Sequence, residues 1–312
     1  MAIKPRILVV GSANVDFIAN TERVPVAGET LLSRGNYEFV PGGKGANCAV
    51  AAARLGADVV FCTRVGNDTY GKMLSKVYSD EKLDCRSVIV DKKLPTGLAA
   101  IYVEASGANR ITVFPGANSA VSRADVEDAF MSYPDALLTQ FEIPLDTVYY
   151  AIKQANENDT PVIVDGGPVP AELDFSALGK LTVFSPNESE AYAYTGIRPV
   201  DADSYIRICL DLYSRINVDY IVLKLGEKGC YVYDGHFGEA VPSYRVTAVD
   251  TTAAGDSFTA ALTYEFLRSG NIRDCLFSTA DMAEWYVDKN GDLRADAIHH
   301  DGTNHYLYRV FK

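Results

Sequence analysis

The sequence has few of the residues from which several kinds of site are built. It holds four histidines in 312 residues, and three of them fall within the last fourteen positions. The remaining one, His236, sits in a glycine-flanked turn, so a Ser-His-Asp hydrolase is poorly supported. The six cysteines are scattered and form no Cys-x-x-Cys pair, which is typical of reduced thiols in a cytoplasmic protein.

Long apolar runs and an excess of positive charge are also absent. No stretch approaches the roughly 20 apolar residues of a membrane span, and the apolar run at residues 7–10 is too short for a signal peptide. The net charge of −12 disfavours nucleic acid or an anionic membrane as a partner. An anionic nucleotide remains compatible, because amides at helix N-termini bind phosphate without net positive charge.

The residues that are present predict a large α/β domain. Hydrophobic residues make up 48% of the chain and charged residues 22%, which is enough to bury a core. Continuously apolar runs, typical of parallel strands buried on both faces, alternate with helical patterns. This alternation predicts a three-layer α/β/α fold with a doubly wound, mostly parallel sheet. The expected strands are residues 7–11, 59–65, 137–142, 162–165, 181–185, 220–225 and 231–233, and the expected helices include 48–55, 146–156 and 204–216.

Two regions break this rhythm, at about residues 14–41 and 96–115. Both read as strands with no helix between them, and the second alternates like a half-exposed antiparallel pair around a turn at residues 106–107. Together they predict a small sheet that acts as a lid and keeps water from a reacting group. Without a linker or repeat, we expect a single domain over residues 1–312. The exposed edge of the lid could form a homodimer with a second copy.

The segment PGGKGAN, residues 41–47, runs directly into an alanine-rich helix. Its glycines allow the backbone to approach a ligand closely, and Asn47 offers a donor and an acceptor to a hydroxyl. A tight strand-to-helix turn would explain the glycines equally well. The segment is not a Walker A loop, because the order GxxxxGK[ST] is missing.

The segment DTTAAGD, residues 250–256, follows an expected strand at 244–249 and opens a helix over about 257–268. Consecutive amides of Ala253, Ala254 and Gly255, aided by the helix dipole, would form an anion hole for a phosphoryl group. Asp256 is placed to accept the proton of a hydroxyl, as the base of a kinase must. It could instead be an N-terminal capping residue.

The two segments, about 200 residues apart, resemble the two signature regions of the ribokinase-like (PfkB) carbohydrate kinases, and the similarity runs from about residue 6 to 277. The resemblance implies an ATP-dependent sugar kinase with Asp256 as base. It also leans toward ribose as acceptor, while fructose, other ketoses, 2-keto-3-deoxygluconate and nucleosides such as adenosine stay open. The implied sugar contacts are Asn14, Asp16, Gly42, Gly43, Lys44, Asn47 and Glu142.

The same resemblance implies where ATP and Mg²⁺ bind. NESE, residues 187–190, is similar to the family's NxxE motif, so Asn187 would contact ATP and Glu190 would hold Mg²⁺ through water. Taken alone, these two residues read as a helix cap and a first-turn acid. KLGEKG, residues 224–229, is similar to the nucleotide loop, although many ribokinases have threonine in place of the lysine. The implied ATP contacts are Asn187, Lys224, Gly226, Glu227 and Gly229.

The C-terminal segment, residues 280–312, departs from the family pattern. Members of the family carry an alanine-rich helix and a loop here, which wall the adenine and bind a monovalent cation, typically K⁺. The implied cation contacts are Asp250, Thr252 and Val287. The matching helix, residues 280–286, has acquired acidic and aromatic residues that a close helix–sheet interface accepts poorly. The segment therefore indicates either a remodelled C-terminus or a non-catalytic sugar-sensing pseudokinase.

Overall fold

The computed structural model describes residues 4–243, 253–272, 283–287, 293–300 and 305–309. The expected strand at residues 244–249 lies outside the described residues. Asp250 and Thr252, two of the three implied K⁺ contacts, lie outside them as well.

The larger sheet of the described residues has nine strands, in the spatial order β13-β12-β11-β10-β9-β8-β1-β4-β5. These are β1 (Arg6–Val10), β4 (Asp58–Gly66), β5 (Val88–Asp91), β8 (Ala136–Thr139), β9 (Val162–Asp165), β10 (Leu181–Ser185), β11 (Val218–Lys224), β12 (Cys230–Tyr233) and β13 (Gly238–Val241). The strands from β11 to β5 are parallel, and β12 and β13 are antiparallel additions at one edge. The predicted mostly parallel sheet is confirmed.

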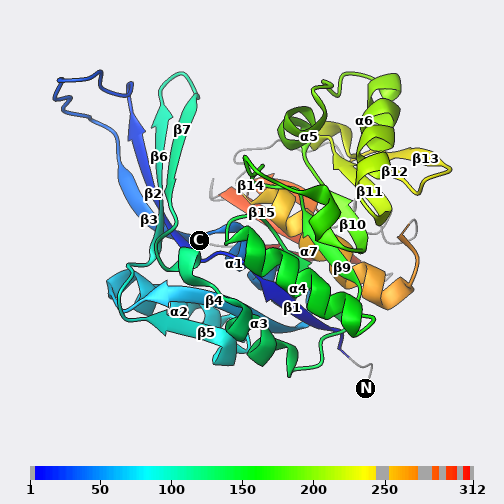
Figure 1. The fold of residues 1–312 in the computed structure, drawn as a ribbon. Coiled ribbons are helices and arrows are strands. Elements are labelled where there is room, and N and C mark those ends of the chain that lie inside the picture. The colour runs from blue at the N-terminus through cyan, green and yellow to red at the C-terminus, as the bar shows by residue number, and fades with distance from the viewer. Residues whose placement is uncertain (1–3, 244–252, 273–282, 288–292, 301–304, 310–312) are drawn as a thin grey trace.

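Helices cover both faces of this sheet (Figure 1). Successive side chains of β1 point to opposite faces, so Ile7 and Val9 join the core under α1, α2 and α7, while Leu8 and Val10 join the core under α3, α4 and α6. The predicted three-layer α/β/α fold is therefore confirmed. The helices are α1 (Lys44–Leu55), α2 (Thr69–Asp80), α3 (Arg123–Phe130), α4 (Leu145–Glu157), α5 (Glu188–Thr195), α6 (Ala202–Arg215) and α7 (Ala254–Ser269), with short 3₁₀ helices η1 (Cys85–Ser87), η2 (Gly116–Ala120), η3 (Phe175–Leu178) and η4 (Gly226–Lys228).

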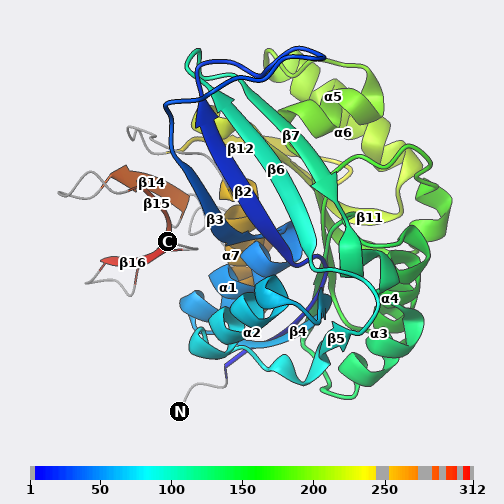
Figure 2. The same ribbon diagram turned by 90° about the vertical axis from the view of Figure 1, so that its left-hand side faces the viewer.

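A second sheet projects from the main body, as Figures 1 and 2 show. Its order is β3-β2-β6-β7, with β2 parallel to β6 and the two outer pairs antiparallel. Asn14 at the start of β2 pairs with both Gly42 and Gly97, so the connections to the main body gather at one end. We call this end the base of the lid. The strands are β2 (Asn14–Thr21), β3 (Tyr37–Gly42), β6 (Gly97–Glu104) and β7 (Asn109–Phe114).

The C-terminal part contains a three-stranded antiparallel sheet of β14 (Ala283–Val287), β15 (Leu293–His300) and β16 (His305–Arg309). The prediction of a helix at residues 280–286, which came from counting along the family pattern, is wrong for residues 283–286, because residues 283–287 form β14. Trp285, Tyr286 and Val287 belong to the aromatic and β-branched types that favour strands, which accounts for the difference. Among the described residues, no helix is both long and apolar enough to cross a membrane.

Candidate active site

The site begins where the order of the main sheet reverses. From β1 the chain builds β4 and β5 on one side, and then β8 to β11 on the other. Segments that leave neighbouring strands at such a point form a crevice. Here Ser12, after β1, donates to Glu142 Oε2, after β8, at 2.5 Å. The same oxygen accepts from the Lys44 amide at 3.1 Å, so these two hydrogen bonds hold Glu142 beside the ends of β1 and β8.

Ser12 is a part of the site that the sequence analysis missed. Its hydroxyl also accepts from the Gly45 amide at 3.3 Å, which ties the crevice to the first turn of α1. A small polar residue directly after the first buried strand is the signal that could have identified it.

Asn14 and Asp16 lie two positions apart on β2 and therefore share one face of the lid base. Asp16 is 8% exposed. Burial first, and then the nearby Glu142 and Asp256 carboxylates, raise the pKa of Asp16 to about 7. A Cβ at Gly42 would lie 2.2 Å from Asp16 Oδ2, so glycine is needed for this close approach.

The PGGKGAN segment brings α1 against Asp256, the predicted proton acceptor. Gly43 has a φ of +92°, a backbone conformation that favours glycine, and a Cβ there would lie 2.8 Å from the Asn14 amide nitrogen. One turn into α1, Asn47 Nδ2 donates to Asp256 Oδ2 at 2.7 Å. The side-chain amide of Asn47 thus connects the PGGKGAN segment to Asp256 of the DTTAAGD segment.

Asp256 is the third residue of α7, and the N-cap residue is Ala253, in the left-handed region with a φ of 64°. The capping role that we kept open for Asp256 is therefore not the one it has. Asp256 is 4% exposed and accepts from Lys44 Nζ at 3.2 Å through its other oxygen. The first N–H groups of a helix have no intrahelical partner, so Ala254 and Gly255 stand at an end suited to an anion.

A buried charge network lies behind these residues, centred on Asp165 at the end of β9. Its carboxylate bonds the Lys224 ammonium, accepts from the Thr259 hydroxyl at 2.7 Å and lies 3.5 Å from Lys44 Nζ. Burial alone would raise the pKa of Asp165, but Lys224 and Lys44 lower it to about 2. Burial would likewise lower the pKa of Lys44, but Asp165, Asp256 and Glu190 raise it well above its usual value.

Asp165 and Thr259 were missing from the predicted site. The acid at the carboxyl end of a buried β-branched strand was the available signal for Asp165, since ligand sites collect at that edge. Lys224, predicted to contact ATP, has its ammonium turned into this network.

Asn187 and Glu190 form the capping box of α5. The Glu190 amide donates to Asn187 Oδ1 at 2.9 Å, and the Asn187 amide donates to Glu190 Oε2 at 2.8 Å. The helix-cap interpretation is thus correct, yet Glu190 Oε1 also lies 3.9 Å from Lys44 Nζ. Burial raises the pKa of Glu190. The carboxylate therefore belongs both to the cap and to the cluster around Lys44.

The residues present fit a magnesium ion whose ligands are mainly water and phosphate oxygens rather than protein side chains. Within the described part of the chain, no group of three or more His, Cys, Asp or Glu side chains is placed to hold a metal. Mg²⁺ in nucleotide sites keeps several waters and is bound through one or two carboxylates plus phosphates. Glu190, beside the Lys44 ammonium, can supply one such carboxylate.

The rest of the predicted nucleotide loop is an exposed turn at η4. Gly226 and Gly229 both have positive φ, and the Leu225 amide closes the turn on the Gly229 carbonyl at 2.8 Å. Glu227 is exposed at the tip. The structure therefore separates Lys224, which is buried, from the other predicted ATP contacts of this loop.

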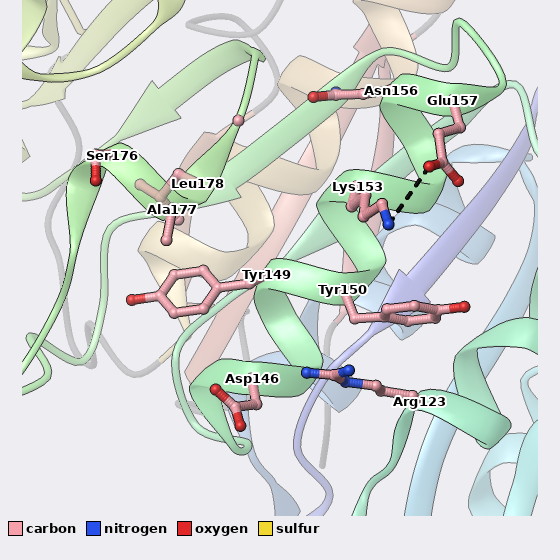
Figure 3. A pocket seen from close by; sticks show the side chains of 11 residues that line it. Arg123, Asp146, Tyr149, Tyr150, Lys153, Asn156, Glu157, Ser176, Ala177 and Leu178 are labelled. Atoms are coloured by element: carbon pink, nitrogen blue, oxygen red, sulfur yellow. Dashed lines mark ion pairs between the residues drawn. The ribbon is translucent and has the colours of Figure 1, made fainter.

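Figure 3 shows a pocket on the outer side of α4, between α3 and η3. Its lining contains none of the predicted site residues. Several lining groups are already engaged, because the Arg123 guanidinium stacks over the Tyr150 ring at 5.5 Å and Lys153 pairs with Glu157 at 3.6 Å. This pocket is not part of the site.

A doubly wound sheet with a carboxylate at a helix N-terminus beside its topological switch point is an arrangement suited to phosphoryl transfer to a hydroxyl group. The family model of the pfkB family carbohydrate kinases matches residues 4–296. The chain belongs to this family, and it is a carbohydrate kinase by that membership.

Individual relatives agree with this membership. The chain is 37% identical over 276 residues to a bifunctional ribokinase/ribose-5-phosphate isomerase A of Fructilactobacillus sanfranciscensis, covering 87% of this chain but half the length of that protein. It is 33% identical to a deoxyribokinase of Salmonella typhi, covering 91% and 93% of the two chains. The structure of Arabidopsis thaliana ribokinase complexed with ribose and ATP superposes with a TM-score of 0.79 at 30% identity, covering 90% and 91%.

Proposed function

We propose that the protein transfers the γ-phosphoryl group of ATP to the primary hydroxyl of D-ribose and forms ribose 5-phosphate. One observation carries this proposal: the Asp256 carboxylate, in the first turn of α7, is held by Asn47 and Lys44 and lies near enough to Asp16 to raise the pKa of that group. Ribokinases among the similar proteins support ribose as the acceptor.

In this mechanism the sugar lies at the base of the lid, with Asn14, Asp16 and Glu142 bonding its hydroxyls. Asp256 accepts the proton of the attacking hydroxyl. The amides of Ala253, the N-cap of α7, and of Ala254 and Gly255 stabilise negative charge on the transferring group. Lys44 is charged and already lies 3.2 Å from Asp256, so it also places a positive charge next to the developing anion.

Asn187 and Glu190 would hold Mg²⁺ through its waters and the phosphates, and this ion would neutralise phosphate charge. The turn at Gly226, Glu227 and Gly229 would approach ATP. We propose a requirement for K⁺ as well, at Asp250, Thr252 and the backbone near Val287, although β14 differs from the expected helix and loop. Initial rates in KCl compared with NaCl and choline chloride would test it.

Replacing Asp256 with asparagine tests the base. The side chain keeps its shape, and its one oxygen can still accept from Asn47 although its nitrogen cannot accept from Lys44. The fold and ATP binding should therefore persist while kcat falls by at least about 100-fold. The measurement is ADP release at saturating sugar and ATP. The control is Asp203→Asn, another first-turn acid but exposed on α6. Full turnover by Asp256→Asn would show that the base is elsewhere.

An ADP-release screen identifies the acceptor. The panel is ribose, 2-deoxyribose, fructose, 2-keto-3-deoxygluconate and adenosine, and we expect the highest kcat/KM with ribose. Deoxyribose is the strongest competitor, because the similar deoxyribokinase is covered over 93% of its length. Stabilisation by ribose without turnover of any acceptor at high ATP and K⁺ would instead identify a sugar-sensing pseudokinase.

The projecting sheet supports two further parts of the proposal. It would act as the lid over the sugar, because the sugar contacts Asn14, Asp16 and Gly42 lie at its base. The β7 strand is exposed along its length and includes Ile111, Val113 and Phe114, so the sheet could also form a homodimer, which sedimentation would test. We place the enzyme in the cytoplasm, which fractionation of cells would test.

A further inference from the structure

Asn118 makes an unusually complete set of hydrogen bonds with the residues that lead into the lid. It lies in η2, just after β7, and is 1% exposed. Its Oδ1 accepts from the Ala13 amide at 2.8 Å, while its Nδ2 donates to the Ala13 carbonyl at 3.1 Å and to Asn14 Oδ1 at 2.8 Å. None of the sequence motifs includes this residue.

These bonds leave one orientation for each of the two carboxamides. The peptide groups of Ala13 cannot exchange donor and acceptor, so Asn118 must turn its oxygen to the Ala13 N–H and its nitrogen to the Ala13 carbonyl. Its remaining N–H then faces Asn14, and only the oxygen of Asn14 can accept it. Asn14 Nδ2 is therefore turned away from Asn118, and it has no hydrogen-bond partner within the described residues.

The neighbouring backbone leaves room for this contact and for nothing larger. A Cβ at Gly97, the β6 residue paired with Asn14, would lie 2.2 Å from Asn14 Oδ1 and 2.3 Å from Asn118 Nδ2. Glycine at this position is thus matched to the bond between the two carboxamides. The contact joins the first residue of β2 to η2, which follows β7.

We propose that Asn118 is a positioning residue for the sugar, which fixes Asn14 so that its Nδ2 donates to a sugar hydroxyl oxygen. This inference rests on the proposed function. Asp16, on the same face of β2, accepts from a hydroxyl, so the pair presents one fixed donor and one fixed acceptor. Because a hydroxyl can do both, the pair selects a hydroxyl over a hydrogen at the contacted carbon.

Asn14→Asp isolates the donor. It keeps an oxygen toward Asn118 but turns a carboxylate oxygen toward the sugar. We expect the KM for the sugar to rise roughly tenfold or more, with the KM for ATP within about twofold of wild type and a similar melting temperature. The assays are run at pH 8.5, above the pKa of about 7 of Asp16 on the same face. The control is Asn20→Asp, the same change at an exposed position of β2. An unchanged sugar KM in folded Asn14→Asp overturns the inference.

Asn118→Asp tests the positioning itself. It sets an acceptor against Asn14 Oδ1, so Asn14 should rotate and offer its oxygen to the sugar, raising the sugar KM while kcat at saturation stays within about twofold. In an Asn14→Ala background the same change should have no further effect on the sugar KM, because no carboxamide remains to be oriented. Additive effects would mean a merely structural role and would refute the inference.

The two proposals fail in distinguishable ways. Both variants are assayed with whichever sugar the wild-type protein phosphorylates. Wild-type turnover with an unchanged sugar KM in the variants removes the roles of Asn14 and Asn118 at the sugar and leaves the proposed phosphoryl transfer standing. A wild-type protein that phosphorylates no sugar removes the proposed function and this inference together. If Asn118→Asp does not fold, Asn118→Ala takes its place in the same comparison, because it also removes the hydrogen bond to Asn14 Oδ1, and its effect on the sugar KM should again disappear in the Asn14→Ala background.

Discussion

Burial and two neighbouring carboxylates raise the pKa of Asp16 to about 7, so the sugar contact that we propose for it predicts that sugar binding depends on pH. The carboxyl group accepts a sugar hydroxyl well only when it is ionised. We therefore expect the sugar KM to rise as the pH falls from 8 to 6, by up to about tenfold per pH unit below the pKa. Sugar KM measured over this range checks the prediction, and a flat wild-type profile would contradict it.

The same group opposes folding at neutral pH. Its pKa is higher in the folded chain than the ordinary value of 3.8, so between about pH 4 and 7 the folded state binds more protons than the unfolded state. The free energy of unfolding must then fall as the pH rises through that window. Asp16→Asn should be more stable than wild type at pH 8, on the order of 2 kcal/mol, and similar at pH 4. Urea unfolding at both pH values measures this difference, and equal stability at pH 8 would contradict it.

Single residues were predictable from sequence when they lie in contiguous motifs. Asp16, Asn47 and Asp256 each belong to a short segment whose residue types indicate a chemistry, and the structure gathers them. Ser12 and Asn118 have no such neighbours: their partners lie 130 and 104 positions away in the sequence. Hydrogen bonds of that kind are set by the path of the chain, which no local pattern records.

Among the secondary-structure elements, Asp68 ties the lid to the main body. As N-cap of α2 its Oδ1 accepts from the Gly71 amide at 2.8 Å, and its two oxygens also accept from the hydroxyl and the amide of Thr96, next to β6. Thr96 in turn accepts from the Gly66 amide at 3.0 Å, at the end of β4. One carboxylate thus joins a helix start to the base of the lid.

Asp68→Ala should lower the free energy of unfolding by about 1–2 kcal/mol through loss of the cap. It should also speed amide hydrogen exchange in β6 and β7 more than in β1 and β8, because the lid loses a support that the main sheet does not use. Asp201→Ala, which removes the matching N-cap of α6, is the control, since it should cost similar stability without affecting the lid. Uniform exchange in both variants would show that Asp68 does not hold the lid.

Elements were best predicted where one local signal dominates. The β-branched runs of β9 and β10 gave their observed limits, Val162–Asp165 and Leu181–Ser185. The run expected at residues 137–142 ends as a strand at Thr139, because the chain then leaves the sheet and brings Glu142 to Ser12. At β14 the expectation came from counting along a family pattern, and the strand propensity of the actual residues prevailed.

At the scale of the whole molecule, the network around Asp165 joins the two halves of the site. It links the ends of β9 and β11 to α7 through Lys224 and Thr259, and to α1 through Lys44. All of these groups except Lys44 are buried. Removing one member of a buried ion pair leaves an uncompensated charge, whereas removing both does not.

Asp165→Asn and Lys224→Met should each reduce the free energy of unfolding by about 3–5 kcal/mol. The double variant should lose clearly less free energy of unfolding than the two single variants together, because neither charge of this pair remains without its partner. The control is Lys153→Met with Glu157→Gln, an exposed pair on α4, which should cost less than about 1 kcal/mol. Chemical denaturation of the wild type, the two single variants and the double variant gives the coupling energy, with the control double variant measured alongside. Strict additivity of the two losses would contradict the predicted coupling.

The arrangement of the lid connections has a mechanical consequence. The four strands meet the main body at one end, where Asn14, Gly42, Gly97 and Phe114 lie, so the sheet is attached at its base and projects at its tip. Eight residues of β2 give an arm of about 26 Å at roughly 3.3 Å per residue. A rotation of about 10° at the base would therefore carry the tip through about 5 Å. If the sugar binds at this base, as we propose, ångström-scale adjustments around it would be enlarged along the sheet into a displacement of about one helical turn at the tip.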